Sequence, residues 1–137
     1  MYDHIGLKVK DLDASVLLLG WYGFHPASSP RMRSTFDHIR RRLGAGRGLF
    51  FRYDDSLRTG EGAFWLCSFW AVELLARGAG TPAEARQLME AARAHANDVG
   101  LMAEEIEPVT LEGLGNFPQA YTHVGLINAA LSLEEAR

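Results

Sequence analysis

The chain has 137 residues, the size of one domain, and its 47% hydrophobic and 23% charged residues are typical of a globular protein. A formal net charge of −3 gives no basic surface, so we expect no nucleic-acid partner. No uncharged apolar run reaches the roughly 18–20 residues of a membrane span, and the N-terminus lacks the layout of a signal peptide. The single cysteine, Cys67, lies in an apolar run, which excludes an internal disulfide and fits a structural thiol in a reducing compartment. We therefore expect a cytoplasmic protein without a membrane partner.

The first half of the chain predicts one short strand and two helices. Weak alternation over the first ten residues favours a strand, and the apolar run that follows favours a buried helix ending near Gly20 to Gly23. Ser29 and Pro30 are typical of a helix start, and Gly44 of a helix end. Residues 40–42, all arginine, are predicted to be the solvated side of this second helix. Its buried face is expected to contain Met32, Phe36, Ile39 and Leu43.

The second half predicts three more helices. Residues 49–53 read as a brief extended segment and residues 63–75 as a strongly apolar helix. Thr81 and Glu84 form a capping-box pattern that opens a helix to about Asn97. Residues 101–115 read as a loop. Asn116, with Gln119 three residues later, is a plausible cap for a final helix marked by Tyr121, Val124, Ile127 and Leu131. Five helices and little strand predict an all-α protein.

Two segments between the predicted helices hold residues that suit sugar chemistry. Residues 51–65 combine acids, arginines, glycines and aromatic rings, as sugar sites do, although Asp-Asp-Ser is also an ordinary turn. Residues 101–107 place three carboxylates beside apolar side chains: Glu104, Glu105 and Glu107. Such a cluster is able to supply a general base, and the alternative is a solvated acidic loop.

Metal and nucleotide sites have little support. The five histidines show no close ligand spacing, so we expect no metal and no cofactor. Residues 44–48 are rich in glycine but follow a predicted helix rather than a strand, and they lack the lysine of a phosphate-binding loop.

Longer motifs in these segments resemble glycoside hydrolase family 15, which contains glucoamylases, related glucosidases and trehalases. Residues 60–70 (GEGAFWLCSFW) and 115–123 (GNFPQAYTH) resemble its signature stretches. Residues 12–15, 51–53 and 100–105 also match in the order and spacing of the family. The resemblance covers roughly nine tenths of the chain, from Asp11 to Leu133.

The resemblance implies a fold and a reaction. The family fold is an (α/α)6 barrel of helical hairpins, so residues 12–137 are expected to form an arc of about five helices. The family hydrolyses α-linked glucose with inversion, which requires an acid and a base about 6.5–9.5 Å apart. The resemblance implies that Glu104 is the catalytic base and that Arg52 binds substrate. It implies weaker substrate-binding candidates in Glu61, Trp65 and Trp70.

The general acid of the family lies on an upstream stretch that these residues do not contain. Glu105 and Glu107 are too near Glu104 in the sequence to replace it. We therefore expect these 137 residues to be inactive alone, and glucoamylase and trehalase specificity stay equally open. Because part of a barrel exposes apolar helix faces, we also expect a homo-oligomer, in which two arcs complete each other's core.

The first eleven residues have a different character. Residues 1–12 resemble the first strand of the glyoxalase/bleomycin-resistance superfamily, in which a histidine at the place of His4 can be a metal ligand. The resemblance fades after Ser15, so we predict a junction of two unrelated sequences near Asp11 to Ser15, natural or constructed. Three function classes follow: a glycoside hydrolase by descent, a non-catalytic helical or carbohydrate-binding remnant, and a metal-dependent glyoxalase-like enzyme.

Overall fold

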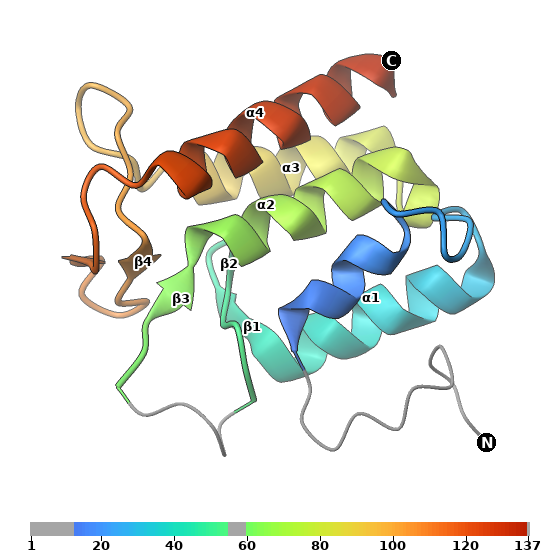
Figure 1. The fold of residues 1–137 in the computed structure, drawn as a ribbon, viewed down its shortest axis with the longest axis horizontal. Coiled ribbons are helices and arrows are strands. Elements are labelled where there is room, and N and C mark those ends of the chain that lie inside the picture. The colour runs from blue at the N-terminus through green and yellow to red at the C-terminus, as the bar shows by residue number, and fades with distance from the viewer. Residues whose placement is uncertain (1–12, 55–59, 137) are drawn as a thin grey trace.

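The computed structural model describes residues 13–54 and 60–136, and these residues form a mainly helical structure (Figure 1). His4 and the strand expected in the first ten residues lie outside the described part. The helices are η1 (Ala14–Leu19), α1 (Pro30–Leu43), α2 (Trp65–Leu74), η2 (Leu75–Ala79), α3 (Pro82–Arg93) and α4 (Ala120–Glu135). The all-α prediction is confirmed, and it disfavours the sheet-rich glyoxalase-like alternative. None of the described helices is long and apolar enough to cross a membrane.

Two of the helix starts that the sequence predicted, at Ser29 and at Thr81, are correct. The Ser29 hydroxyl accepts a hydrogen bond of 3.2 Å from the Met32 backbone N–H at the start of α1. At the start of α3, the Glu84 N–H donates to the Thr81 hydroxyl (3.1 Å), and the Thr81 N–H donates to the Glu84 carboxylate (2.8 Å). This reciprocal pair is a complete capping box. The predicted end near Asn97 was too late, since α3 ends at Arg93.

Helix α2 is the centre of the core. It contacts α4, α3, η1 and β2 (Leu49–Phe50), and Figure 1 shows it between α4 and α1. Because it has neighbours on every side, nearly all of its side chains are buried, including Phe69 and Val72 at 0% exposure. Cys67 is among them, and burial raises the pKa of its thiol well above the ordinary value. A structural thiol is therefore the better interpretation.

The short strands were the main feature that the sequence prediction missed. Strand β1 (Gly44–Gly46) pairs with β2, and a second antiparallel sheet has the order β3 (Ala63–Phe64), β4 (Glu105–Ile106), β5 (Gly113–Leu114). Residues 101–115 were predicted to be a loop, which is wrong for β4 and β5. Two-residue strands are too short to produce a detectable period.

Helix α4 has the predicted position. Its buried face, however, is not the one that carries its large apolar residues. Its buried residues are Thr122, Gly125, Ala129 and Ser132. A Cβ atom on Gly125 would lie 2.7 Å from Leu66 Cδ1, so small residues allow α4 to approach α2 closely. The larger residues are more than half exposed: Tyr121, Val124, Ile127 and Leu131. We call these four residues the α4 stripe.

Candidate active site

The two segments that the sequence selected meet at the three-stranded sheet. Ala63 pairs with Ile106 and Phe64 with Glu105, which joins segments about 40 positions apart. The Gly62 backbone N–H donates a 2.7 Å hydrogen bond to the Glu105 carboxylate. A Cβ atom on Gly62 would lie 2.6 Å from the Ile106 carbonyl oxygen, so a glycine is needed for this approach. The sheet therefore brings the arginine- and glycine-rich segment against the acidic one.

Glu104 is held in place by the turn before α4. Its Oε2 atom accepts hydrogen bonds from the Asn116 side-chain amide (3.0 Å) and backbone N–H (3.4 Å). The Glu104 backbone N–H donates to the Asn116 carbonyl oxygen at 2.9 Å, which fixes both segments together. The other carboxylate oxygen, Oε1, has no hydrogen-bond partner among the described residues.

The start of α4 supports the acidic segment from behind. The buried Thr122 hydroxyl donates to the Ala103 carbonyl oxygen (3.1 Å), and the Gln119 N–H donates to the Met102 carbonyl oxygen (3.0 Å). Met102 and Ala103 are buried. The backbone that leads to Glu104 is therefore fixed on both sides, by the core and by α4.

Arg52 and Glu61 form an ion pair beside this segment. The guanidinium carbon of Arg52 lies 4.6 Å from the Tyr53 ring centroid and 4.4 Å from the Phe64 ring centroid. Two aromatic contacts and one carboxylate hold the planar guanidinium in a defined orientation. The Arg52 Nε atom is buried without a hydrogen-bond partner among the described residues.

The pKa of Glu105 depends on burial and on the charges of its neighbours. Burial raises its pKa, and the negative charges of Glu61 and Glu104 act in the same direction. The Gly62 N–H and the positive charge of Arg52 oppose this effect. The four charged side chains thus form one electrostatically coupled cluster, although only Glu105 was not among the site residues that the sequence resemblance implied.

The two tryptophans lie elsewhere. Trp65 is 2% exposed, stacks on Phe69 at a ring distance of 6.3 Å and contacts the His95 ring. Its indole face is occupied by the core and offers no surface to a sugar. Trp70 is partly buried and packs against the hydrophobic cluster that contains Leu17. The structure brings Arg52 and Glu61 next to Glu105, the residue that follows Glu104, and leaves both tryptophans in hydrophobic packing.

Sequence reasoning missed the role of Asn116, which it interpreted as a helix cap. The cap of α4 is Gln119, whose side chain accepts a 3.3 Å hydrogen bond from the Tyr121 N–H. Asn116 binds Glu104 instead, and no local pattern marks a contact across 12 positions. Over residues 13–54 and 60–136, no group of three or more His, Cys, Asp or Glu side chains is arranged to hold a metal ion.

Comparisons with known proteins show which family this chain resembles. Residues 80–131 match the family described as Glycosyl hydrolases family 15. A trehalase of Mycolicibacterium smegmatis is 45% identical over 130 residues, which are 91% of this chain and 19% of the relative. A trehalase of Thermoplasma acidophilum is 43% identical over 129 residues, 93% of this chain and 22% of the relative. This chain therefore spans about a fifth of the length of these relatives.

A solved structure titled "Glycosidase Wild Type" superposes with a TM-score of 0.81 at 20% identity, over 98% of this chain and 39% of that one. At this identity the match shows a shared fold. The predicted resemblance to the family and the predicted helical fold are thus confirmed. The foreign origin of residues 1–11 stays a prediction.

Proposed function

We propose that this relative of the family 15 glycoside hydrolases carries the base half of an inverting α-glucosidase site, with Glu104 as the general base. One observation supports this most strongly. Asn116 binds one oxygen of the Glu104 carboxylate, and no other residue that the structure describes binds the second oxygen. A general base needs this combination of fixed orientation and one free oxygen within reach of water. Since the named relatives are trehalases, we propose trehalose or another α-linked glucose as the substrate.

In the proposed reaction, Glu104 Oε1 takes a proton from water while that water attacks the anomeric carbon from the face opposite the leaving oxygen. Arg52, fixed by Glu61 and two aromatic rings, donates hydrogen bonds to sugar hydroxyls. The protonated leaving group requires a second carboxylic acid about 6.5–9.5 Å from the base. The two carboxyl groups then have separate roles, and the leaving sugar departs as an alcohol.

The described residues offer no good acid. Burial raises the pKa of Glu105, as an acid catalyst would need, but its carboxylate is bound to the Gly62 N–H. Glu105 also follows Glu104 directly, and successive residues of an extended segment point to opposite sides. We therefore propose that the 137 residues alone hydrolyse little or no sugar. The general acid is proposed to lie in a part of the relatives that these residues do not match.

A hydrolysis assay on the 137-residue chain tests this proposal. The substrates are trehalose, maltose and maltooligosaccharides, and the variants are Glu104→Gln and the control Glu107→Gln. Glu107 is in the same segment, but its carboxylate binds the backbone N–H groups of Val109 and Thr110. We expect no turnover by any of the three proteins. Hydrolysis that is lost only in Glu104→Gln would support Glu104 as the base, but it would contradict the proposal that these residues lack the acid. Equal hydrolysis by all three would contradict the base as well.

A non-catalytic binding function is the second candidate, and the Arg52–Glu61 pair beside Glu105 favours it. Calorimetry with glucose and trehalose distinguishes it from ancestry alone. Binding that weakens in Arg52→Lys, where the planar guanidinium is lost, would support a binding remnant. Absence of binding in the unmodified chain would contradict it.

We further propose that the α4 stripe is covered by a second copy of this chain. Helix α4 has no Asp, Glu, Lys or Arg from Ala120 to Leu133, and the stripe is more than half exposed. Antiparallel pairing of two such helices about a two-fold axis places the same uncharged face against itself. Sedimentation at several concentrations should show a dimer that Ile127→Glu dissociates. A compact monomer at every concentration would contradict the proposal.

A further inference from the structure

A cavity of about 390 Å³ lies between α1, the β1–β2 hairpin and α3. It has the size of a small-molecule site, and none of its lining residues belongs to the candidate active site. Its apolar lining comes from three elements of the core and from α3: Phe36, Leu49, Phe50, Leu75, Leu88 and Ala91. The first four of these are nearly fully buried, so they form a fixed floor.

The hairpin wall of the cavity is fixed against α3. Gly48 has a φ of +80°, and a Cβ atom there would lie 2.8 Å from the Ala92 backbone nitrogen and 3.0 Å from Ala91 Cβ. On the other side, the Gly44 N–H bonds to the Arg40 carbonyl oxygen at the end of α1. The start of the hairpin therefore contacts α1 and its turn contacts α3, so this wall of the cavity is held by packing against two helices.

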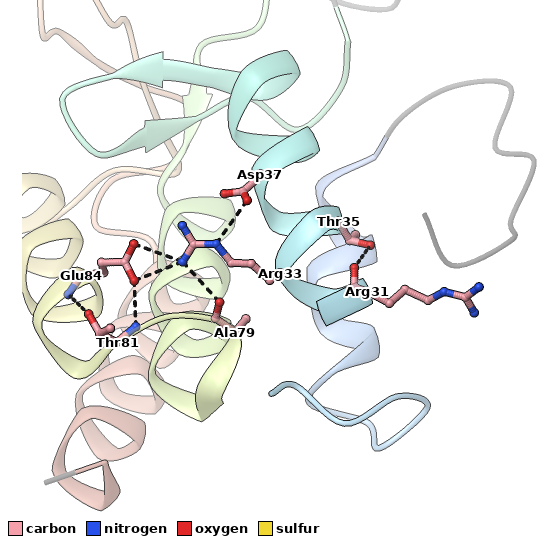
Figure 2. A network of polar contacts seen from close by, with 7 residues as sticks. All are labelled: Arg31, Arg33, Thr35, Asp37, Ala79, Thr81 and Glu84. Atoms are coloured by element: carbon pink, nitrogen blue, oxygen red, sulfur yellow. Dashed lines mark hydrogen bonds and ion pairs between the residues drawn. The ribbon is translucent and has the colours of Figure 1, made fainter. Parts of the chain in front are cut away.

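The polar part of the cavity is positive. Arg40 and Arg47 line it, both are exposed, and neither forms an ion pair with another described residue. Glu84 also lines it, but its carboxylate accepts bonds of 3.1 Å from Arg33 and 2.8 Å from the Thr81 N–H (Figure 2). The Thr81 N–H and Arg33 lower the pKa of Glu84, so its negative charge persists. Arg33 offsets only part of this charge, because it also forms a 3.2 Å ion pair with Asp37, whereas the cavity itself is lined by two arginines and one glutamate.

Two guanidinium groups that form no ion pair with the described residues, beside an apolar floor, suit one ligand chemistry. We propose that this cavity binds a small organic carboxylate, whose anionic group bonds to Arg40 and Arg47 and whose apolar body lies on the floor. The charge of Arg40 also stabilises the C-terminal end of α1, but this does not explain Arg47, which lies in the hairpin. The proposal does not depend on the proposed glycosidase function.

Titration with 2-naphthoate, followed by calorimetry and by the fluorescence of the probe, tests this site. The variants are Arg40→Gln, Arg47→Asn and the double variant. Asn is chosen because Arg47 has a φ of +53°, which asparagine tolerates. The control is Arg86→Gln, an exposed α3 arginine outside the cavity lining. We expect 1:1 binding that each single variant weakens about fivefold or more, that the double variant abolishes, and that the control leaves unchanged.

Three results of the direct titrations would overturn the proposal: no binding of 2-naphthoate at millimolar concentration, equal binding of the neutral 2-naphthalenemethanol, or unchanged binding in the double variant. Competition of acetate with 2-naphthoate distinguishes binding in the apolar cavity from binding to the charge of the two arginines alone. If acetate competes as well as an apolar carboxylate, the floor plays no part and the proposal is wrong. Circular dichroism of each variant verifies the fold, and Arg47→Asn tests the site even if Arg40→Gln fails to fold.

Discussion

Replacement of Gly115 by alanine tests how tightly the turn before α4 holds Glu104. Gly115 has a φ of +74°, and its added Cβ would lie 2.9 Å from Glu104 Oε2 and 3.0 Å from Glu104 Cβ. The Glu104 carboxylate is flexible enough to move aside. The Glu104 Cβ atom is not, because the Glu104 backbone N–H is hydrogen-bonded to the Asn116 carbonyl oxygen. Gly100 is the matched control, because its φ is +80° and an added Cβ would meet nothing within 4 Å.

The two substitutions share the backbone penalty and differ only in the contact. A left-handed conformation costs a residue with a Cβ about 1–2 kcal/mol, so Gly100→Ala should lose about that much stability. Gly115→Ala should lose about 1–3 kcal/mol more, as overpacking does. In urea, with a slope of about 2 kcal/mol per molar, the Gly115 variant should unfold at a midpoint about 0.5–1.5 M below that of the Gly100 variant. Equal midpoints would refute the close packing of this turn against Glu104.

Three further predictions concern the scaffold. Burial raises the pKa of Glu73 above its ordinary 4.5, so the folded protein binds this proton more tightly than the unfolded chain. The stability of Glu73→Gln relative to the unmodified chain should therefore be greater at pH 7 than at pH 4.5, and thermal unfolding at both pH values measures it. Gly48→Ala should destabilise more than Gly46→Ala in urea, because both residues have positive φ but only Gly48 contacts α3. Thr81→Ala removes the capping box and should lose about 1 kcal/mol by the same assay, whereas no loss would contradict the cap.

Local signals in the sequence were enough to locate the helices. Ser29 and Thr81 each satisfy backbone N–H groups within three positions, so their caps are visible in the sequence itself. The face of α4 was not predictable in this way. Large apolar residues mark one side of that helix, but Gly125 and Ala129 make the close contact with the core. A periodic pattern detects hydrophobic residues, whereas close packing of two helices also requires small side chains at the contact.

The candidate site was only partly predictable for a similar reason. The segments that hold Arg52 and Glu104 were recognisable from their composition and motifs. Their contact depends on the pairing of Phe64 with Glu105, and the orientation of Glu104 depends on Asn116. Such pairings between separate segments leave no local period or spacing in one sequence. Trp65 shows the opposite error, since an aromatic residue next to a site motif is part of the core.

The central claim is that Glu104 is the base of an inverting site whose other half lies in parts of the relatives that these residues do not match. A chimera tests it most directly: residues 13–136 replace the matching segment of the Mycolicibacterium smegmatis trehalase, and trehalose hydrolysis is measured. The chimera should hydrolyse trehalose, and Glu104→Gln within it should lower kcat by about 10²–10⁴-fold with little change in unfolding temperature. A folded, active chimera in which Glu104→Gln keeps full kcat would contradict the account.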